Sequence, residues 1–291
     1  MASTTRDAFD KFYAAIQPTD TQISSMATKR IATHNYLIEG FGPSSDMPLI
    51  RTELIGSAQR ATIIRPVDDI DVMAVFSDSN DVYENTYVLN SHAFINRIRR
   101  VLGEGSTATV GVRGQAVRLF YKSGAHVDIA PVFAANSGGY LLPSGNGGWI
   151  TTDPDKQFQW FKSEVQRLGS HLLPTIRLLK RWNNVHSKHF NSYHLEVVIA
   201  HSFGSLGGDW RDNLAKFFEW APGHLGVADP AGHSGKLDDY LGYAKRQALL
   251  LRLSNAGARA KDALAAEARG DHKEAIRLWR IELGDEFPAY Y

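Results

Sequence analysis

The sequence predicts an α+β protein, in which a mixed sheet with packed helices is followed by a helical lobe. Short apolar runs bounded by glycine and other turn residues gather between residues 49 and 133, as is typical of strands. From Asp155 onward, apolar residues recur at intervals of three and four, as in amphipathic helices. We therefore expect residues 1–150 to form a core with the N-terminal helices, and residues 151–291 to form the helical lobe.

Two helices are expected before the sheet. Residues 5–16 place Phe9, Phe12 and Tyr13 on one helical face. Residues 19–37 keep helical spacing after a threonine and an aspartate that are typical of a helix start. A helix of this length could brace both lobes.

The sheet is expected to contain five strands separated by turn residues. They are Leu49–Ile55, Ile70–Phe76, Thr107–Val112, Ala116–Tyr121 and His126–Phe133. A helix is expected over residues 90–102, and the glycine- and serine-rich stretch Asn136–Gly148 is expected to be a loop.

The second half is expected to be helical. A stripe that begins with Phe158 and Phe161 continues past Pro174 to Leu179. Further helices are expected at Leu195–Phe203, Asp238–Leu253, Ala256–Ala268 and His272–Leu283.

The composition excludes several functional classes. The 291-residue chain has 32 lysines and arginines against 31 acidic residues, which argues against wrapping of duplex nucleic acid. The chain contains no cysteine, so cysteine nucleophiles and cysteine-ligated zinc are excluded. No apolar run approaches the length of a membrane span, and the first residues lack a signal-peptide core. We expect a cytoplasmic protein with no membrane partner.

Acidic residues gather at the start of one strand and recur in another. Asp69 and Asp71 point to one face of a strand, whereas Asp68 points away or lies in the preceding turn. Asp128 is flanked by Val127 and Ile129, and an aspartate in an apolar strand is costly to bury unless it is paired or binds metal. Three such carboxylates are suited to two Mg²⁺ ions, with Mn²⁺ as an alternative, and to in-line phosphoryl transfer.

A glycine-serine turn precedes these acids. Gly56 allows close approach of the backbone, and Ser57 can reach a phosphate oxygen at the start of a helix. Arg60 would add positive charge, whereas a solvated surface role is as reasonable for Arg65. The segment therefore favours phosphate binding.

The string GSAQRATIIRPVDDIDVMAVF, followed by the later HVDIA, resembles the polymerase β-like nucleotidyltransferase superfamily. Within it, the chain resembles the cGAS/DncV-like nucleotidyltransferases (CD-NTases, or SMODS nucleotidyltransferases) of bacterial CBASS anti-phage systems. Gln59 is a mild departure, because many members have an aromatic residue there. The strings RLLKRWN and SYHLE and the C-terminal segment extend the resemblance over nearly the whole chain.

The resemblance implies a polymerase β-like core and a helical lobe, with the active site in the cleft between them. It also implies that Lys180 and Ser192 contact the donor triphosphate and that Tyr193 stacks on its base. The residues alone leave other roles open: Lys180 as a snorkelling helix lysine, Ser192 as a helix N-cap with Glu196 near capping-box spacing, and Tyr193 as a core residue.

Other polar residues of the second half favour simpler roles. His186, His189 and His194 could only hold zinc together with carboxylates, so a structural zinc site is not favoured. A basic run at helical spacing is more suited to steering triphosphates than to binding duplex nucleic acid. The run comprises Arg177, Lys180, Arg181 and Lys188.

The implied reaction is attack of a ribose hydroxyl on the α-phosphate of a nucleoside triphosphate, with release of pyrophosphate. Repetition in one active site would give a cyclic di- or trinucleotide, a second messenger that reaches its effector by diffusion. The alternatives are a synthase of linear oligonucleotides, as in oligoadenylate synthases, and a catalytically inactive nucleotide sensor. No stable duplex partner is expected, and a monomer is the simplest expectation.

Overall fold

A computed structural model describes residues 1–105 and 108–291 of the chain. The chain divides into two compact units: a sheet unit (Pro18–Ala61 and Pro66–Phe158) and a helical unit (Met1–Gln17, Thr62–Arg65 and Gln159–Tyr291). The chain passes for the last time from the sheet unit to the helical unit after Phe158, whereas the expected boundary was residue 150. The two units are not separated by one boundary in the sequence, because the first seventeen residues and the segment Thr62–Arg65 also belong to the helical unit.

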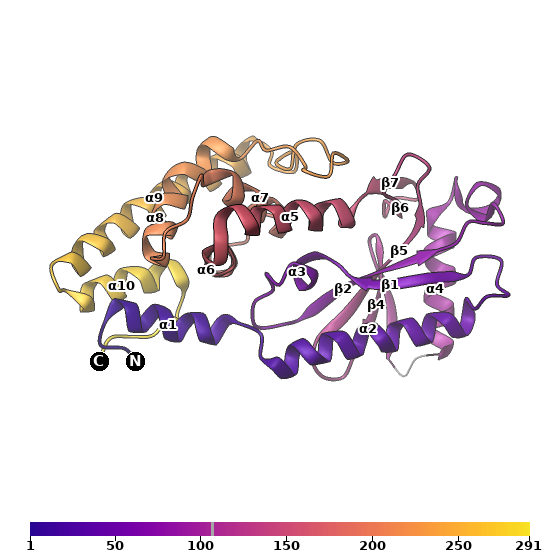
Figure 1. Ribbon diagram of the computed structural model, residues 1–291, viewed down its shortest axis with the longest axis horizontal. Coiled ribbons are helices and arrows are strands. Elements are labelled where there is room, and N and C mark those ends of the chain that lie inside the picture. Colours follow the sequence, from indigo (N-terminus) through magenta and orange to yellow (C-terminus); the bar gives the residue numbers. More distant parts are fainter. Residues whose placement is uncertain (106–107) are drawn as a thin grey trace. The chain divides into compact units, whose positions relative to one another are not determined.

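The sheet unit is built on one mixed seven-stranded sheet (Figure 1). Its strands are β1 (Leu49–Leu54), β2 (Asp69–Phe76), β3 (Thr109–Arg113), β4 (Ala116–Phe120), β5 (His126–Ala134), β6 (Tyr140–Pro143) and β7 (Trp149–Thr152). The main order is β1-β2-β5-β4-β3, and β6 joins β5 to β7. β2 and β5 are parallel, whereas the other pairs are antiparallel. The expected mixed sheet is confirmed.

Helices cover one face of this sheet. α2 (Asp20–Gly40) packs on β1 and α4 (Ser91–Gly105) on β3 and β4, while a single π-helical turn, η1 (Tyr83–Tyr87), precedes α4. Phe76 of β2 contacts Phe94 of α4 edge to face, which fixes the face of β2 that points to the helices. Because side chains alternate along a strand, the odd-numbered residues of β2 point to the opposite face.

One expectation for the sheet unit is wrong. The stretch Asn136–Gly148, expected to be a loop, contains β6, which pairs with both β5 and β7. Its glycines mark the two turns beside the strand: Gly138 and Gly147 have positive φ, which favours glycine. Thr107, the first residue of the third expected strand, lies outside the described residues.

The helical unit is built from α1, most of α5, and five further helices. The helices are α1 (Thr5–Ile16), α5 (Pro154–Leu168), α6 (Leu172–Val185), α7 (Ser192–Ser202), α8 (Trp210–Trp220), α9 (Tyr243–Ala268) and α10 (His272–Leu283). Short 3₁₀ turns lie at η2 (Gly169–His171) and η3 (Ala221–His224). The two chain termini lie side by side, and the N–H of Ala2 donates to the carbonyl of Ala289 at 2.9 Å.

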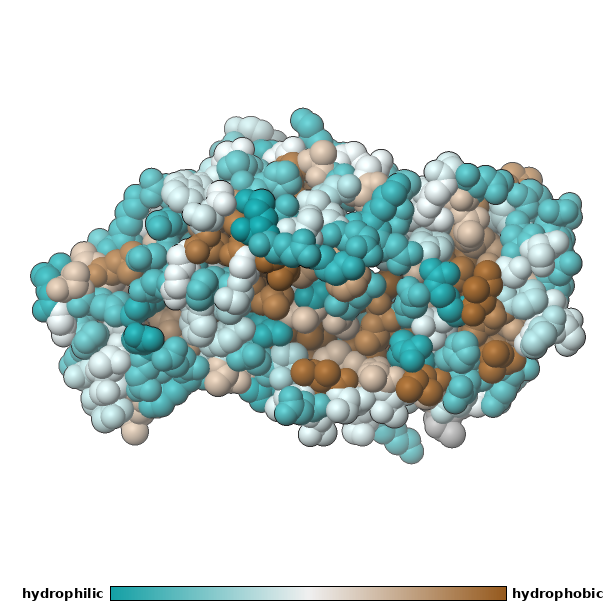
Figure 2. Space-filling view, viewed as in Figure 1, coloured by the Kyte–Doolittle hydropathy of each residue, from teal (hydrophilic) through white to brown (hydrophobic). Residues whose placement is uncertain are grey.

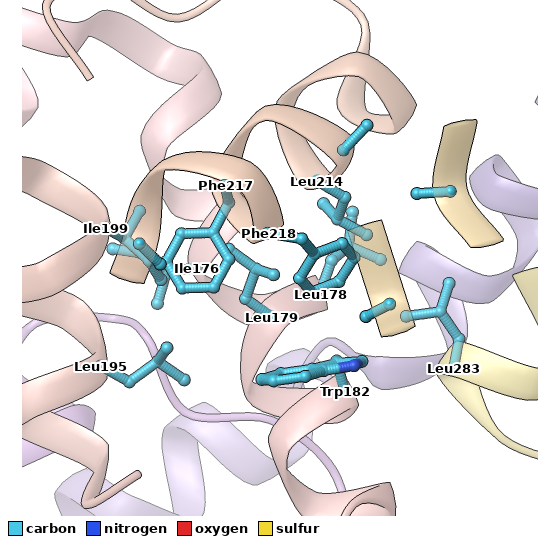
Figure 3. Packing of buried hydrophobic residues seen from close by; sticks show 14 of the residues in the cluster. Ile176, Leu178, Leu179, Trp182, Leu195, Ile199, Leu214, Phe217, Phe218 and Leu283 are labelled. Carbon is cyan, nitrogen blue, oxygen red and sulfur yellow. The ribbon is translucent and has the colours of Figure 1, made fainter. Parts of the chain in front are cut away.

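The core of this unit lies where α6, α7, α8 and α10 meet (Figure 3). Trp182 of α6 packs against Phe218 of α8 with ring centroids 5.0 Å apart. The indole N–H of Trp182 donates to Glu282 at 3.0 Å, so the buried ring keeps a polar partner. This packing fixes α6 and α7, which carry the candidate nucleotide contacts.

The helix expectations are mostly confirmed. α1 and α10 have the expected bounds. Asp238–Leu253 and Ala256–Ala268 were expected to be separate helices, but a single helix, α9, begins only at Tyr243 and runs through both. Gly257 lies within this helix, and a Cβ there would be in ordinary contact with Phe218 at 3.5 Å. α8 was not expected from the sequence.

On the face drawn in Figure 2, hydrophilic residues cover most of the area and hydrophobic residues form separate patches. Among the described residues, no helix is both long enough and apolar enough to cross a membrane.

Candidate active site

The three acids lie together on the face of the sheet that is opposite α2 and α4. Asp71 of β2 and Asp128 of β5 are direct partners in the parallel register, and Asp69 lies two residues earlier on the same face of β2. Ile70 precedes Asp71, and Val127 precedes Asp128; both are buried on the helix-covered side of the sheet. The alternation expected from the sequence is confirmed.

Asp68 takes no part in this face. It precedes β2, its side chain is exposed, and its backbone carbonyl accepts the N–H of His126 at 2.8 Å. That hydrogen bond fixes the start of the β2–β5 pairing. Asp68 therefore has a backbone role beside the site, as its position before the strand indicated.

An arginine that the sequence analysis did not single out joins two of the acids. Arg118 of β4 is the register partner of Asp128. Its Nε and Nη2 donate to the two carboxylate oxygens of Asp128, each at 2.5 Å, and Nη2 also donates to Asp69 at 2.9 Å. Arg113, at the end of β3, lies farther away, 3.7 Å from Asp69 and 4.0 Å from Asp128.

Asp71 is the carboxylate whose pKa is most affected by the site. Burial and the charges of Asp69 and Asp128 together raise the pKa of Asp71 to about 6, while Arg60 and Arg118 oppose the rise. A carboxylate in this position is stabilised by an added cation.

The donor set therefore fits a divalent metal ion in its chemistry. Hard carboxylate oxygens on one face of two adjacent strands are the ligands that Mg²⁺ prefers. The distances between the side chains do not fit a metal site in the same way. Among the described residues, no group of three or more acidic or histidine side chains is arranged at metal-binding distances. The guanidinium of Arg118 lies against Asp69 and Asp128.

The glycine-serine turn lies directly beside Asp71. β1 ends at Leu54, and Gly56 begins the four-residue helix α3 (Gly56–Gln59). Gly56 has φ +64°, and a Cβ there would lie 2.7 Å from Oδ2 of Asp71, so both backbone and space require glycine. Ser57 is half-buried, and Arg60 directly follows the helix and is buried. The local geometry expected for the turn is confirmed, and its phosphate-binding role stays a prediction.

Lys180 of α6 lies in a buried polar network of the helical unit. Its Nζ is 2.5 Å from Glu196 of α7, and it donates to the hydroxyl of Thr62 at 3.0 Å. Thr62 in turn donates to Glu196 at 2.6 Å. Glu196 is fully buried, so Lys180 balances its charge rather than extending to solvent.

Ser192 and Tyr193 begin α7. Ser192 is the first helical residue and is exposed, and the N-cap is Asn191, so the capping-box alternative for Ser192 and Glu196 is wrong. Tyr193 is half-buried against the core, and its hydroxyl donates to Asp229 at 3.4 Å. Tyr193 therefore packs partly against the core, as the packing alternative expected. Nucleotide contact stays a prediction for Lys180, Ser192 and Tyr193.

Several of the histidines and basic residues have partners inside the helical unit. His186 lies 3.0 Å from the carbonyl of Glu282, and His194 lies 2.8 Å from the carbonyl of Leu225. Arg181 pairs with Glu286 at 2.9 Å. These contacts assign structural roles to the side chains concerned.

Two residues of these networks were missed by sequence reasoning. Arg118 could have been found, because a turn centred on Ser123 and Gly124 places it opposite Asp128 on the same face of a hairpin. Thr62 carried no such signal, because its partners Lys180 and Glu196 are more than one hundred residues away.

Comparison with known proteins places this geometry in a wider group. A family model described as the Second Messenger Oligonucleotide or Dinucleotide Synthetase (SMODS) domain matches residues 3–164. A probable cyclic nucleotide synthase of Bacillus cereus is 28% identical over 270 residues, covering 81% of each chain. A cyclic AMP-AMP-AMP synthase of an Acinetobacter species is 20% identical over 98% of this chain and 86% of its own length.

The fold is likewise similar to a solved structure. Escherichia coli CdnC, in its complex with HORMA-deltaN, superposes with a TM-score of 0.78 at 17% identity. The match covers 97% of this chain and 98% of CdnC. It therefore extends over both the sheet unit and the helical unit.

Proposed function

Because the chain belongs to the SMODS family of cGAS/DncV-like nucleotidyltransferases, we propose that it condenses nucleoside triphosphates into a cyclic di- or trinucleotide and releases pyrophosphate. The chain has the fold of polymerase β-like nucleotidyltransferases with a helical lobe. The proposal concerns the reaction of this chain, its metal ions, its product and its site residues.

One observation carries the proposal: Asp71 and Asp128 are register partners on adjacent strands, with Asp69 on the same face and Gly56 in contact distance of Asp71. This arrangement supports a set of oxygen ligands beside a turn that can receive a triphosphate. Asp69, Asp71 and Asp128 would hold the two divalent cations, Mg²⁺ or Mn²⁺. When bound, these ions would lower the pKa of the attacking hydroxyl and neutralise the leaving pyrophosphate.

The other residues of the proposal bind and orient the donor nucleotide. Gly56 and Ser57 offer backbone N–H groups and a hydroxyl to its phosphates, and Arg60 adds positive charge beside them. Lys180 and Ser192 contact the triphosphate, and Tyr193 supplies an aromatic face for the base. The pairing of Lys180 with Glu196 supports a fixed lysine position, since a buried ion pair holds the side chain in one geometry.

The test is to supply each labelled nucleoside triphosphate singly and in pairs with Mg²⁺, and to identify the product by mass and nuclease sensitivity. We expect pyrophosphate release and a product that resists phosphatase, because a ring has no terminal phosphate. A phosphatase-sensitive product would instead indicate a synthase of linear oligonucleotides. No pyrophosphate release with any mixture would indicate a nucleotide-binding protein without catalysis.

We further propose that the product acts as a second messenger on a separate effector in anti-phage signalling. Family membership supports this role, since the names of the relatives describe cyclic nucleotide synthases. The test is to challenge bacteria carrying the chain and its neighbouring genes with phage. Protection should be lost when Asp69 and Asp71 are both changed to asparagine, and protection that persists would contradict the signalling role.

A further inference from the structure

Arg118 is held by the same oxygens that a divalent cation would use. β4 and β5 are antiparallel, and Arg118 and Asp128 face each other as register partners on one face of the sheet. The guanidinium engages both carboxylate oxygens of Asp128 and Oδ2 of Asp69. The side chains of Arg118 and Asp128 are 11% and 15% exposed, so water screens their pair little, whereas Asp69 is 48% exposed and its contact is more strongly screened. This is a bidentate arginine–carboxylate pair, the geometry in which such pairs are strongest.

The positive charge of Arg118 is permanent. An arginine guanidinium stays protonated in proteins, so it does not leave by losing a proton. It can leave only by moving. A Mg²⁺ ion needs oxygen ligands at about 2.0–2.1 Å, and it cannot share the lone pairs that point at the guanidinium.

We propose that Arg118 is a built-in counter-cation, which binds the carboxylates of Asp69 and Asp128 and competes with divalent cations for their oxygens. The inference rests on the proposed function, because it concerns the metal ions of that reaction. Arg118 is thus a positioning residue that sets the metal affinity of the site.

The competition has a thermodynamic consequence. A metal ion that takes the lone pairs facing the guanidinium must displace it from those contacts, so the observed affinity is reduced by the free energy of those contacts. Removal of Arg118 should therefore tighten metal binding. In the absence of metal, the same removal should lower the stability of the sheet unit, because Asp69, Asp71 and Asp128 are left to repel each other.

The first test measures Mn²⁺ binding by calorimetry or by electron paramagnetic resonance, without nucleotide. We expect Arg118→Met to lower the Kd for Mn²⁺ by about tenfold, a change within the usual range for coupled binding events. Arg113→Met should change the Kd much less, because Arg113 lies 3.7 Å or more from the carboxylates and its side chain is 65% exposed. Arg97→Met, at the ion pair with Asp46, is the distant control. An unchanged or raised Kd in Arg118→Met would overturn the proposal.

The second test uses the unmodified chain, in case Arg118→Met does not fold. Nuclear magnetic resonance of arginine Nε–H groups should show the Arg118 signal shifting or broadening as Mg²⁺ is added, while the Arg97 signal stays constant. An Arg118 signal that is unmoved at saturating Mg²⁺ would contradict the displacement. If the unmodified chain bound no divalent cation at all, the proposed function itself would fail, which is a distinct outcome.

Discussion

At the scale of single residues, the site is a problem of charge balance. Asp69, Asp71 and Asp128 lie on one face, and burial together with the charges of Asp69 and Asp128 raises the pKa of Asp71. Arg118 balances the charges of Asp69 and Asp128 through hydrogen bonds. The same carboxylate oxygens therefore bind Arg118 and are the proposed metal ligands. Substitutions of these residues should affect stability and activity differently.

The carboxylates can be separated from their neighbour Asp68 by substitution. Asp69→Asn combined with Asp71→Asn should reduce pyrophosphate release to the level of an enzyme-free control, because the neutral amides are poor ligands for Mg²⁺. Asp68→Asn should keep most of the activity, because its backbone carbonyl makes the hydrogen bond to His126. Circular dichroism checks that all variants fold. If Asp68→Asn were as inactive as the double variant, the assigned roles of these acids would be wrong.

Gly56 is fixed by two independent constraints. Gly56→Ala should destabilise the protein by about 1–2 kcal/mol from the left-handed backbone alone. It should also reduce activity, because the new methyl group would lie 2.7 Å from Oδ2 of Asp71 and displace that carboxylate. Gly103→Ala is a matched control, since Gly103 lies in α4 with nothing within 4 Å of the added carbon. Thermal unfolding and turnover measure both variants, and equal behaviour would contradict the steric account.

At the scale of elements, register and packing bring the functional groups together. The parallel pairing of β2 with β5 aligns Asp71 with Asp128, and the hairpin of β4 and β5 adds Arg118. In the helical unit, α6 and α7 are joined through a buried ion pair. Each group is placed by an element whose position depends on a distant partner.

The ion pair between α6 and α7 should be strongly coupled. Lys180→Met leaves the fully buried Glu196 without its cation and should destabilise the protein by about 3–5 kcal/mol. Lys180→Met combined with Glu196→Gln should be less destabilised than the sum of the two single variants, because no buried charge is left unpaired. Urea unfolding of the three variants gives the coupling free energy.

A surface pair provides the control for this cycle. Lys261 and Glu219 lie 3.0 Å apart, but both are more than half exposed, so Lys261→Met should change stability by less than about 0.5 kcal/mol. Additive effects in the Lys180–Glu196 cycle would contradict the buried network. Additivity would also mean that Lys180→Met does not act on stability through the ion pair with Glu196. A loss of activity in this variant would then report only the loss of a nucleotide contact.

At the scale of the whole molecule, the chain has a near-neutral charge, and its two units are built from segments that alternate along the sequence. Lysines and arginines exceed acidic residues by one, so global repulsion is weak and local networks decide how stability responds to pH. Histidines are the side chains whose usual pKa lies nearest to neutrality. His194 is the most buried of those with a shifted pKa: it lies between the hydroxyl of Tyr240 and the carbonyl of Leu225.

Acid should weaken the fold through His194. Burial lowers the pKa of His194 below 6.5, so the folded protein resists a proton that the unfolded chain accepts. The stability from neutral His194 is complete above pH 6.5 and is lost as the pH falls through the lowered value. The melting temperature of His194→Gln should therefore depend less on pH between about 7 and 5 than that of the unmodified chain.

A control histidine outside this network checks the assignment. His34→Gln, on α2, should leave the pH dependence of the melting temperature as it is in the unmodified chain. Some dependence should remain in His194→Gln, because burial also lowers the pKa of His189 and His201. An unchanged slope in His194→Gln would contradict the assigned role.

The sequence alone determined the features that depend on local period and local sterics. Alternation along a strand placed Asp69 and Asp71 on one face, and helical spacing gave the bounds of α10. The tertiary structure alone decided that Arg118 reaches Asp69 of β2 in addition to its hairpin partner Asp128, that Thr62 joins Lys180 and Glu196, and that β6 forms within a glycine-rich stretch. Local patterns fix which way a side chain points, whereas its partner depends on register and packing between segments far apart in the chain.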